Sequence, residues 1–381
     1  MKNAVYILGA GASKDFGLPL GTEVFDCAEK LAAASSVFPN AAQLKALLRQ
    51  VENHLHRIFT NLPPNKKDYP PLEEVLTFLW GCKKGERFDY KQRKLISLFD
   101  NDNGVEGVFD TFVKMMAVTL AGCLQVNQSR NSTQTFTEFI KSLDFEKKNI
   151  SFISLNYDVI LDNALLECVQ QGIITDYTYG IPVSHIEQTY RDASAQQLCR
   201  KGGVLLLKPH GSLNLVLCRR HRQCDCGEGF YYSKTNLIAA NATELKCPCC
   251  RRRPEPLLIP PLFNKPDYVA RKSIRREGTW RSTSEVYREW YVDRKIKEIL
   301  GTADDIIVIG YSMPAYDYDF KTLLMTGLMQ NENRRKTRLR IITKANATDA
   351  QNLKVQFERF AGSAVIEASD GFYDFLKNRE N

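Results

Sequence analysis

The stretch Asn3-Ala4-Val5-Tyr6-Ile7-Leu8-Gly9-Ala10-Gly11-Ala12-Ser13 decides the fold. Its first part is an apolar run of strand length, and two glycines follow at once. Helical spacing begins at Thr22, which can cap a helix, and continues to Ala34, so the chain opens with a strand, a glycine turn and a helix. Because glycine has no Cβ, such a turn either brings backbone amides close to a phosphate or serves packing.

Length and composition describe a globular chain. Its 381 residues, 44% of them hydrophobic, are enough for one large core with one or two appended modules. We expect a soluble, cytoplasmic protein, because there is no run of 18 apolar residues and the first residues lead into a strand rather than a signal peptide. The net charge of +8 suits an anionic ligand, but by itself indicates neither nucleic-acid binding nor a membrane partner.

Six of the eleven cysteines crowd between Cys218 and Cys250. This density indicates metal binding in a reducing compartment rather than a set of disulfides. Cys247 and Cys250 form one Cys-x-x-Cys pair, and Cys218 forms the other with Cys226 or Cys224. We expect a structural zinc held by Cys218, Cys226, Cys247 and Cys250. Which two thiols are spare stays open: the choice is between Cys224 and Cys218 in the first group and between Cys249 and Cys250 in the second.

Further strand-like runs recur after the first one. They cover 149–155, 204–208, 305–309 and 337–343, and the expected helices cover 22–34, 42–59, 72–80, 91–99, 105–124, 133–143, 158–170, 284–300 and 318–329. The sequence therefore predicts an α/β protein with a doubly wound, Rossmann-like parallel sheet, a helical insertion and a small zinc-ribbon module. The expected parts are 1–35, the start of the core; 36–145, the insertion; 146–216, the continued core; 217–262, the ribbon; and 263–381, the completion of the core.

Polar residues directly follow two of these strands. Asn156 and Asp158 come after 149–155, and His210 comes after 204–208. A parallel sheet brings such strand ends to one edge, where nucleotides bind in open α/β folds. Asn156 can bond a ribose hydroxyl or hold a water, and His210 can act as a general base. Asp158 either contacts a ligand or caps the helix that follows.

A further loop follows the strand 305–309 in the same manner. It contains Gly310 and Ser312, and we expect it at the same edge of the sheet. Asp317 and Asp319 come next, at the start of a helix, where the helix dipole favours acidic residues without any function. These two carboxylates are secondary candidates.

Taken in order, these segments resemble the sirtuin-like NAD-consuming proteins. The glycine turn matches that family's phosphate loop, Asn156 and Asp158 its ribose-binding pair, His210 its catalytic histidine and 310–312 its second nucleotide loop. The match covers the α/β core but little of the helical insertion. The resemblance implies NAD as the substrate, with Asn156 and His210 as catalytic residues. The residues that it implies for NAD binding are Gly9, Ala10, Gly11, Ala12, Ser13, Asp158, Gly310 and Ser312.

Two departures favour NAD hydrolysis over deacylation. Histone-type deacylases continue the phosphate loop with Gly-Ile-Pro-Asp-Phe-Arg, whereas residues 17–22 here are Gly-Leu-Pro-Leu-Gly-Thr. Those enzymes also carry Phe-Gly-Glu after the zinc module, where this chain has Ile259-Pro260-Pro261-Leu262. The sequence is more similar to the bacterial antiphage-defence branch of the family, whose members cleave NAD to ADP-ribose and nicotinamide.

Two alternatives to an NAD glycohydrolase stay open: an NAD-dependent protein deacylase and a non-catalytic sensor of NAD or ADP-ribose. Free NAD hydrolysis is toxic to a cell, so an NADase needs a gate. The resemblance to defence proteins implies a separate ATPase partner, and homo-oligomerisation through the helical insertion is a second form of gating.

Overall fold

A computed structural model gives the structure of the chain. It describes residues 1–34, 38–59, 61–88, 104–127, 132–181, 184–185, 203–217, 230–232, 246, 251, 255–259, 273–276, 279–282, 292–314, 317–333, 336–343, 347–361, 364–368 and 372. The expected helix at 91–99 and the four predicted zinc ligands, Cys218, Cys226, Cys247 and Cys250, lie outside these residues.

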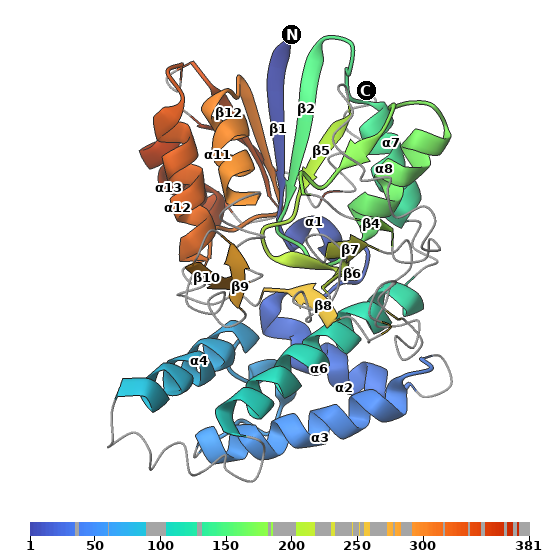
Figure 1. Cartoon of the computed structure of the whole chain (residues 1–381), viewed down its shortest axis with the longest axis vertical. Coiled ribbons are helices and arrows are strands. Elements are labelled where there is room, and N and C mark those ends of the chain that lie inside the picture. The colour runs from blue at the N-terminus through green and yellow to red at the C-terminus, as the bar shows by residue number, and fades with distance from the viewer. Residues whose placement is uncertain are drawn as a thin grey trace.

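A parallel sheet forms the centre of the molecule (Figure 1). Its order is β13 (Ala364–Ala368), β12 (Arg338–Thr343), β11 (Asp305–Ile309), β1 (Lys2–Leu8), β2 (Lys148–Ser154), β5 (Val204–Leu207) and β3 (Tyr177–Thr178), and β3 adds only two residues at the edge. Every neighbouring pair is parallel. All five residues of β11 are buried, as expected for a strand in a sheet covered on both faces.

Helices cover both faces of this sheet. In Figure 1, α11 (Asp293–Gly301), α12 (Tyr318–Gln330) and α13 (Ala347–Ala361) stand on one side, and α7 (Ser132–Lys141) and α8 (Ile160–Gln170) stand on the other. The predicted α/β, Rossmann-like arrangement is therefore confirmed. The chain builds one side of the sheet from β1 through β2 to β5 and the other side from β11 through β12 to β13, so the strand order reverses between β1 and β11.

A layer of helices lies beyond the carboxyl ends of the strands (Figure 1). It contains α2 (Val24–Ala33), α3 (Ala41–Ile58), α4 (Leu72–Phe88) and α6 (Gly104–Val126), with the short turns η1 (Gly21–Glu23) and η2 (Lys66–Asp68). Helices α2, α3 and α4 all contact α6. Helices α3, α4 and α6 come from the expected helical insertion, 36–145, whereas α2 comes from the expected start of the core. Helix α7, from the end of the expected insertion, packs on α8 beside the sheet.

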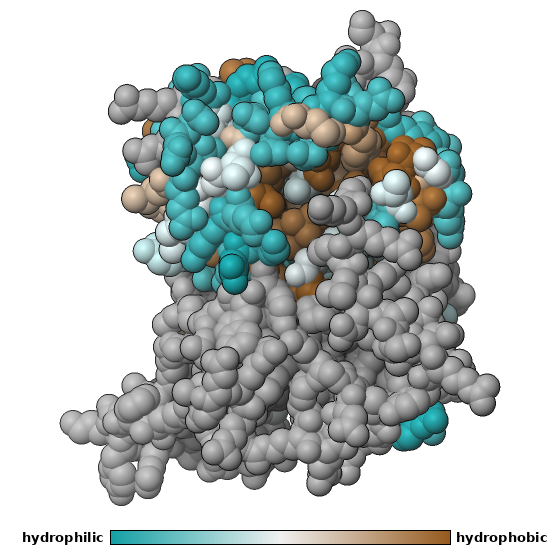
Figure 2. Space-filling model, turned by 45° about the horizontal axis from the view of Figure 1, so that its top comes forward, coloured by the Kyte–Doolittle hydropathy of each residue, from teal (hydrophilic) through white to brown (hydrophobic). Residues whose placement is uncertain are grey.

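One stretch of α6, Gly107–Val126, is long and apolar enough to cross a membrane, although Asp110 and Lys114 interrupt its apolar sequence. Of this stretch 61% is buried inside the protein, where α6 is the central helix of the layer. Figure 2 shows a mainly hydrophilic surface over the described residues of one face, with hydrophobic side chains gathered in the middle and at the right of the view. The cytoplasmic location stays a prediction.

A second, smaller sheet contains β6 (Gly211–Leu217), the strand that begins directly after His210. It pairs β4 (Ser184–His185), β7 (Phe230–Tyr232), β6 and β8 (Glu255–Leu258), and a separate hairpin joins β9 (Ser273–Arg276) to β10 (Thr279–Ser282). Leu217 pairs with Glu255, so the chain leaves β6 and returns in β8 at the same place. The residues between them include the cysteine cluster. Among the residues that the structure does describe, no group of His, Cys, Asp and Glu could hold a metal. The zinc ribbon and the domain limits stay predictions.

The structure corrects several expected boundaries. The helix expected from Asp158 begins at Ile160, and the described part of the helix expected over 284–300 begins at Asp293. Among the elements that were not expected are the short helix α1 (Gly11–Lys14) in the glycine turn and the pair α13 and β13 at one edge of the sheet.

Candidate functional site

A cavity of about 560 Å³ opens at the carboxyl edge of the sheet. The segments that follow β1, β2, β5 and β11 supply one wall, and they contribute Ser13, Asn156, His210 and Gly310 among others. Residues of α4 and α6 in the helical layer supply another wall. The four segments singled out in the sequence therefore meet at one site, at the point where the strand order reverses.

The two glycine loops pack directly on each other. A Cβ on Gly9 would lie 2.6 Å from the Tyr311 Cα, and one on Gly11 would lie 2.8 Å from the Gly310 carbonyl oxygen. The Gly11 N–H donates to that same oxygen at 2.9 Å, and the N–H groups of Ala12 and Ser13 donate to carbonyls within their own turn. Packing therefore explains both glycines, and the predicted contact with a phosphate stays a prediction.

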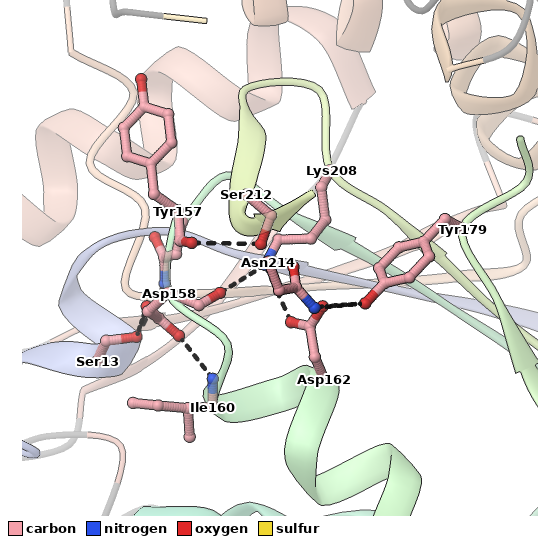
Figure 3. Close-up of polar contacts among 10 residues, drawn as sticks. Ser13, Tyr157, Asp158, Ile160, Asp162, Tyr179, Lys208, Ser212 and Asn214 are labelled. Atoms are coloured by element: carbon pink, nitrogen blue, oxygen red, sulfur yellow. Dashed lines mark hydrogen bonds and ion pairs between the residues drawn. The ribbon is translucent and has the colours of Figure 1, made fainter. Parts of the chain in front are cut away.

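Ser13, Asn156 and Asp158 form one hydrogen-bonded chain, part of which is drawn in Figure 3. Asn156 Nδ2 donates to the Ser13 hydroxyl at 3.0 Å and to the Gly9 carbonyl at 2.9 Å. The Ser13 hydroxyl donates in turn to Asp158 Oδ2 at 2.8 Å. Both bonds of the Asn156 amide use its nitrogen, so its oxygen is the atom that can accept a bond from a ligand.

Asp158 lines the cavity and also contacts the start of α8, although the N-cap residue of that helix is Val159; its contact with a ligand stays a prediction. Its Oδ1 accepts from the Ile160 N–H at 3.0 Å, at the start of α8, and the residue also lines the cavity. Burial raises the pKa of this carboxyl above its usual value, although the Lys208 ammonium and the hydrogen bonds from Ile160 and Ser13 act in the opposite direction. The helix contact holds Asp158 in place, and its partner Ser13 links it to Asn156.

His210 lies at the floor of the cavity with 8% of its side chain exposed. Its Nδ1 is 3.0 Å from the Leu155 carbonyl oxygen at the end of β2. Its Nε2 is 3.5 Å from Oδ1 of Asp317, and Oδ2 of Asp317 accepts a bond from the Tyr311 hydroxyl at 2.9 Å. Asp317, a secondary candidate in the sequence, is therefore part of the site.

Next to Asp158 lies a polar network that sequence analysis missed (Figure 3). The Lys208 side chain is fully buried, and its ammonium donates to the Asp158 carbonyl and, at 2.9 Å, to Asp162 Oδ2. Asp162 also accepts from the Tyr179 hydroxyl at 2.5 Å and from Asn214 Nδ2 at 3.3 Å. The network ties β5, α8 and β6 together below the cavity.

The remaining predicted residues occupy different places around the cavity. Gly9, Ala10, Gly11, Gly310 and Ser312 line it, and Ser312 is exposed. Ala12 is fully buried behind the turn and does not line the cavity. Gly211 and Ser212, which directly follow His210, do not line the cavity: the Ser212 hydroxyl donates to the Tyr157 carbonyl at 3.3 Å.

Carboxylates dominate the charged groups of the cavity. Asp15, Glu73, Asp158 and Asp317 line it, and Glu73 and Asp317 are 6% and 2% exposed. Lys14 also lines it and forms an ion pair with Glu23. Glu73 has no signal in the sequence, because it comes from α4, in the helical region that the four strand-end motifs do not include. A cavity of this charge suits a ligand on which positive charge develops.

The fold and the site together define an α/β protein with a Rossmann-like sheet and, at its switch point, a mainly apolar cavity that contains a few buried polar side chains. Neither a protein-family model nor a curated protein matches the chain.

Proposed function

We propose that this protein is an NAD glycohydrolase that cleaves NAD to ADP-ribose and nicotinamide. One observation carries the proposal: Asn156, His210 and several buried carboxylates line a single cavity with the two glycine loops, at the switch point of a parallel sheet. Open α/β sheets bind nucleotides at this position.

The reaction makes three demands on a site. The bond between nicotinamide and ribose C1′ breaks, and its electron pair leaves with nicotinamide, so positive charge develops on the ribose. A water oxygen then bonds to C1′, and a base must take the proton that this water loses. The site must also fix the sugar so that the water reaches the correct carbon.

The cavity offers a group for each demand. The buried carboxylates of Asp158 and Asp317 suit the positive charge on the ribose. The Asn156 side-chain nitrogen makes two hydrogen bonds, and these fix the position of the amide oxygen. This oxygen would orient a ribose hydroxyl or the water. His210 Nε2 would take the proton, either directly or through a ribose hydroxyl.

The test is to incubate the purified protein with NAD alone and to measure ADP-ribose and nicotinamide. We expect Asn156→Ala and His210→Ala to abolish turnover, each by at least about 100-fold, the usual contribution of a positioned acid or base. Asn53→Ala and His56→Ala are matched controls, because both residues are exposed on α3. These controls should retain full turnover.

The same assay separates the two alternatives. A protein deacylase would consume NAD only when an acylated peptide is added, and a sensor would bind NAD in calorimetry without forming ADP-ribose. We propose that a separate ATPase partner or homo-oligomerisation gates the activity, so each reaction is run with the chain alone and with a co-purified ATPase. Absence of ADP-ribose in both would refute the glycohydrolase.

A further inference from the structure

Asp317 is a buried carboxylate that faces His210 from a different part of the chain. It lies just before α12, whereas His210 follows β5, and 3% of the Asp317 side chain is exposed. Its two oxygens have different neighbours: Oδ1 lies 3.5 Å from His210 Nε2, and Oδ2 accepts from the Tyr311 hydroxyl at 2.9 Å. The Tyr311 ring packs edge-on against Phe320 of α12, which fixes the direction of that hydroxyl.

The hydrogen bond on the far side of the His210 ring determines which nitrogen can take a proton. A carbonyl oxygen can only accept, so the contact between Nδ1 and the Leu155 carbonyl at 3.0 Å requires a hydrogen on Nδ1. The Leu155 N–H donates to the Leu8 carbonyl at 2.8 Å, which holds this carbonyl at the end of the sheet. In a neutral ring, Nε2 is therefore the basic atom, and it is the one that faces Asp317.

Proton uptake at Nε2 creates a cation with little access to water. A buried cation is costly unless an opposite charge pairs with it. Asp317 lies at the distance of an ion pair from Nε2. The other titratable groups of the cavity wall are Lys14, Asp15, Glu73, Tyr157 and Asp158. Lys321 of α12 also interacts with Asp317: burial lowers the pKa of this lysine, and the Asp317 charge offsets part of that effect.

We propose that Asp317, oriented by Tyr311, is a positioning residue for His210: the Leu155 carbonyl holds the neutral ring through Nδ1–H, and Asp317 stabilises and orients the imidazolium when Nε2 takes the proton. The part of this inference that concerns catalysis rests on the proposed NAD hydrolysis. In that reaction the proton passes from the attacking water to Nε2, and the Asp317 carboxylate stays ionised throughout.

The test compares pH profiles of NAD turnover in Asp317→Asn and in wild type, with any activating ATPase present. Without the carboxylate the imidazolium is less favourable, so the acid limb of kcat should move to lower pH by about one unit, with kcat lower by about 10-fold or more and KM little changed. Asp317→Glu, which keeps the charge, should keep the acid limb in place. Tyr311→Phe should move it in the same direction as Asp317→Asn, but less.

Matched controls remove a general effect of the substitutions. Asp144→Asn changes an exposed carboxyl in the turn before β2, and Tyr318→Phe changes an exposed ring at the start of α12. An Asp317→Asn profile identical to that of Asp144→Asn, with the wild type active, would overturn the inference and leave the proposed function intact.

A second measurement holds even if the wild type has no NADase activity. The chain has five histidines, so His210 can be assigned in an NMR titration by comparison with His210→Ala. We expect the half-titration pH of His210 to fall by about one unit in Asp317→Asn, and an unchanged value would refute the pairing.

Discussion

Lys208 has a charge but no access to solvent, so its contacts determine whether that charge can be tolerated. Replacing it in Lys208→Met leaves Asp162 as a buried carboxylate without its ion pair. We expect the free energy of unfolding to fall by about 3–5 kcal/mol, measured by urea denaturation. Adding Asp162→Leu should recover part of the loss, because the uncompensated charge is then removed.

The control for this prediction is a lysine in an exposed ion pair. Lys295 contacts Glu298 on α11 at 2.8 Å, and the two side chains are 40% and 58% exposed. Lys295→Met should therefore cost less than about 1 kcal/mol. If the free energy of unfolding falls no further in Lys208→Met than in Lys295→Met, the buried network contributes little to stability.

The raised pKa of Asp158 predicts the direction in which the free energy of unfolding changes with pH. Burial raises its pKa, so between the usual and the raised value the folded protein holds a proton that the unfolded chain has released. The free energy of unfolding therefore falls as pH rises through this window. In Asp158→Asn this contribution is absent, and the stability of the wild type relative to the variant should decrease from about pH 4 upward in urea unfolding.

Asp144 provides the opposite case. A hydrogen bond from the Lys147 backbone N–H lowers the pKa of this exposed carboxyl. The stabilising contribution of the ionised Asp144 carboxylate is lost as pH falls through the lowered pKa. The free energy of unfolding of the wild type, relative to that of Asp144→Asn, should therefore increase as pH rises. The prediction is contradicted if the difference in the free energy of unfolding between wild type and variant changes with pH in the same direction for Asp158→Asn and for Asp144→Asn.

At the scale of elements, the contact between the glycine turn and the β11–α12 loop holds the cavity wall together. Gly310 has a positive φ of 61°, and a Cβ there would lie 2.2 Å from the Ala12 nitrogen. Gly310→Ala should therefore both strain its own backbone and push α1 away, with a loss of several kcal/mol in urea unfolding, more than the 1–2 kcal/mol of φ strain alone.

Gly172→Ala separates the two causes. Gly172 also has a positive φ, 73°, but a Cβ there would have no neighbour within 4 Å. The free energy of unfolding of Gly172→Ala should therefore fall only by the backbone strain, about 1–2 kcal/mol. If the two alanine variants lose the same stability, contact between the loops is not what requires glycine at 310.

Local pattern was enough to predict most elements of the sheet. The strands β1, β2, β5, β11 and β12 are apolar runs, and the structure has them within one or two residues of their expected limits. The pair α13 and β13 was missed, because α13 is rich in polar residues and β13 has only five residues. An edge strand next to a polar helix gives little signal in hydropathy alone.

The candidate site was predictable only where a motif follows its own strand. Asn156, His210 and Gly310 stand at strand ends, and the parallel sheet brings them together without further information. The pairing of Asp317 with His210 depends on two loops that are more than a hundred residues apart in sequence, and Lys208 resembles any lysine at a strand end. Tertiary packing, rather than local pattern, determines both.

At the scale of the whole molecule, the sheet and the helical layer enclose the cavity from opposite sides. Glu73 of α4 and Met116 of α6 line the same space as the strand-end residues. The helical region is therefore part of the site, not only a candidate surface for assembly. A rearrangement of α4 or α6 by a partner would change the cavity directly, which gives the proposed gate a physical route.

The cysteine module is joined to the site through the small sheet. Leu217 and Glu255 are paired, so the segment between them starts and ends at one point, as a closed metal module requires. The Ile259 N–H, just after β8, donates to the His210 carbonyl at 2.9 Å. We therefore expect the purified protein to contain one zinc per chain, and loss of zinc to loosen β6 and β8 and reduce the order around His210.

Metal analysis of cysteine variants tests this expectation. Cys247→Ser should lose zinc and lower the thermal midpoint, because thiolate ligands of a structural zinc contribute directly to folding. Serine variants of Cys218, Cys224, Cys226, Cys249 and Cys250 then identify the two spare thiols, which should retain the metal. Cys82→Ser on α4 is the control and should keep one zinc per chain. A wild-type protein purified without chelators that contains no zinc would contradict the ribbon; the catalytic predictions are tested separately, by Asn156→Ala and His210→Ala.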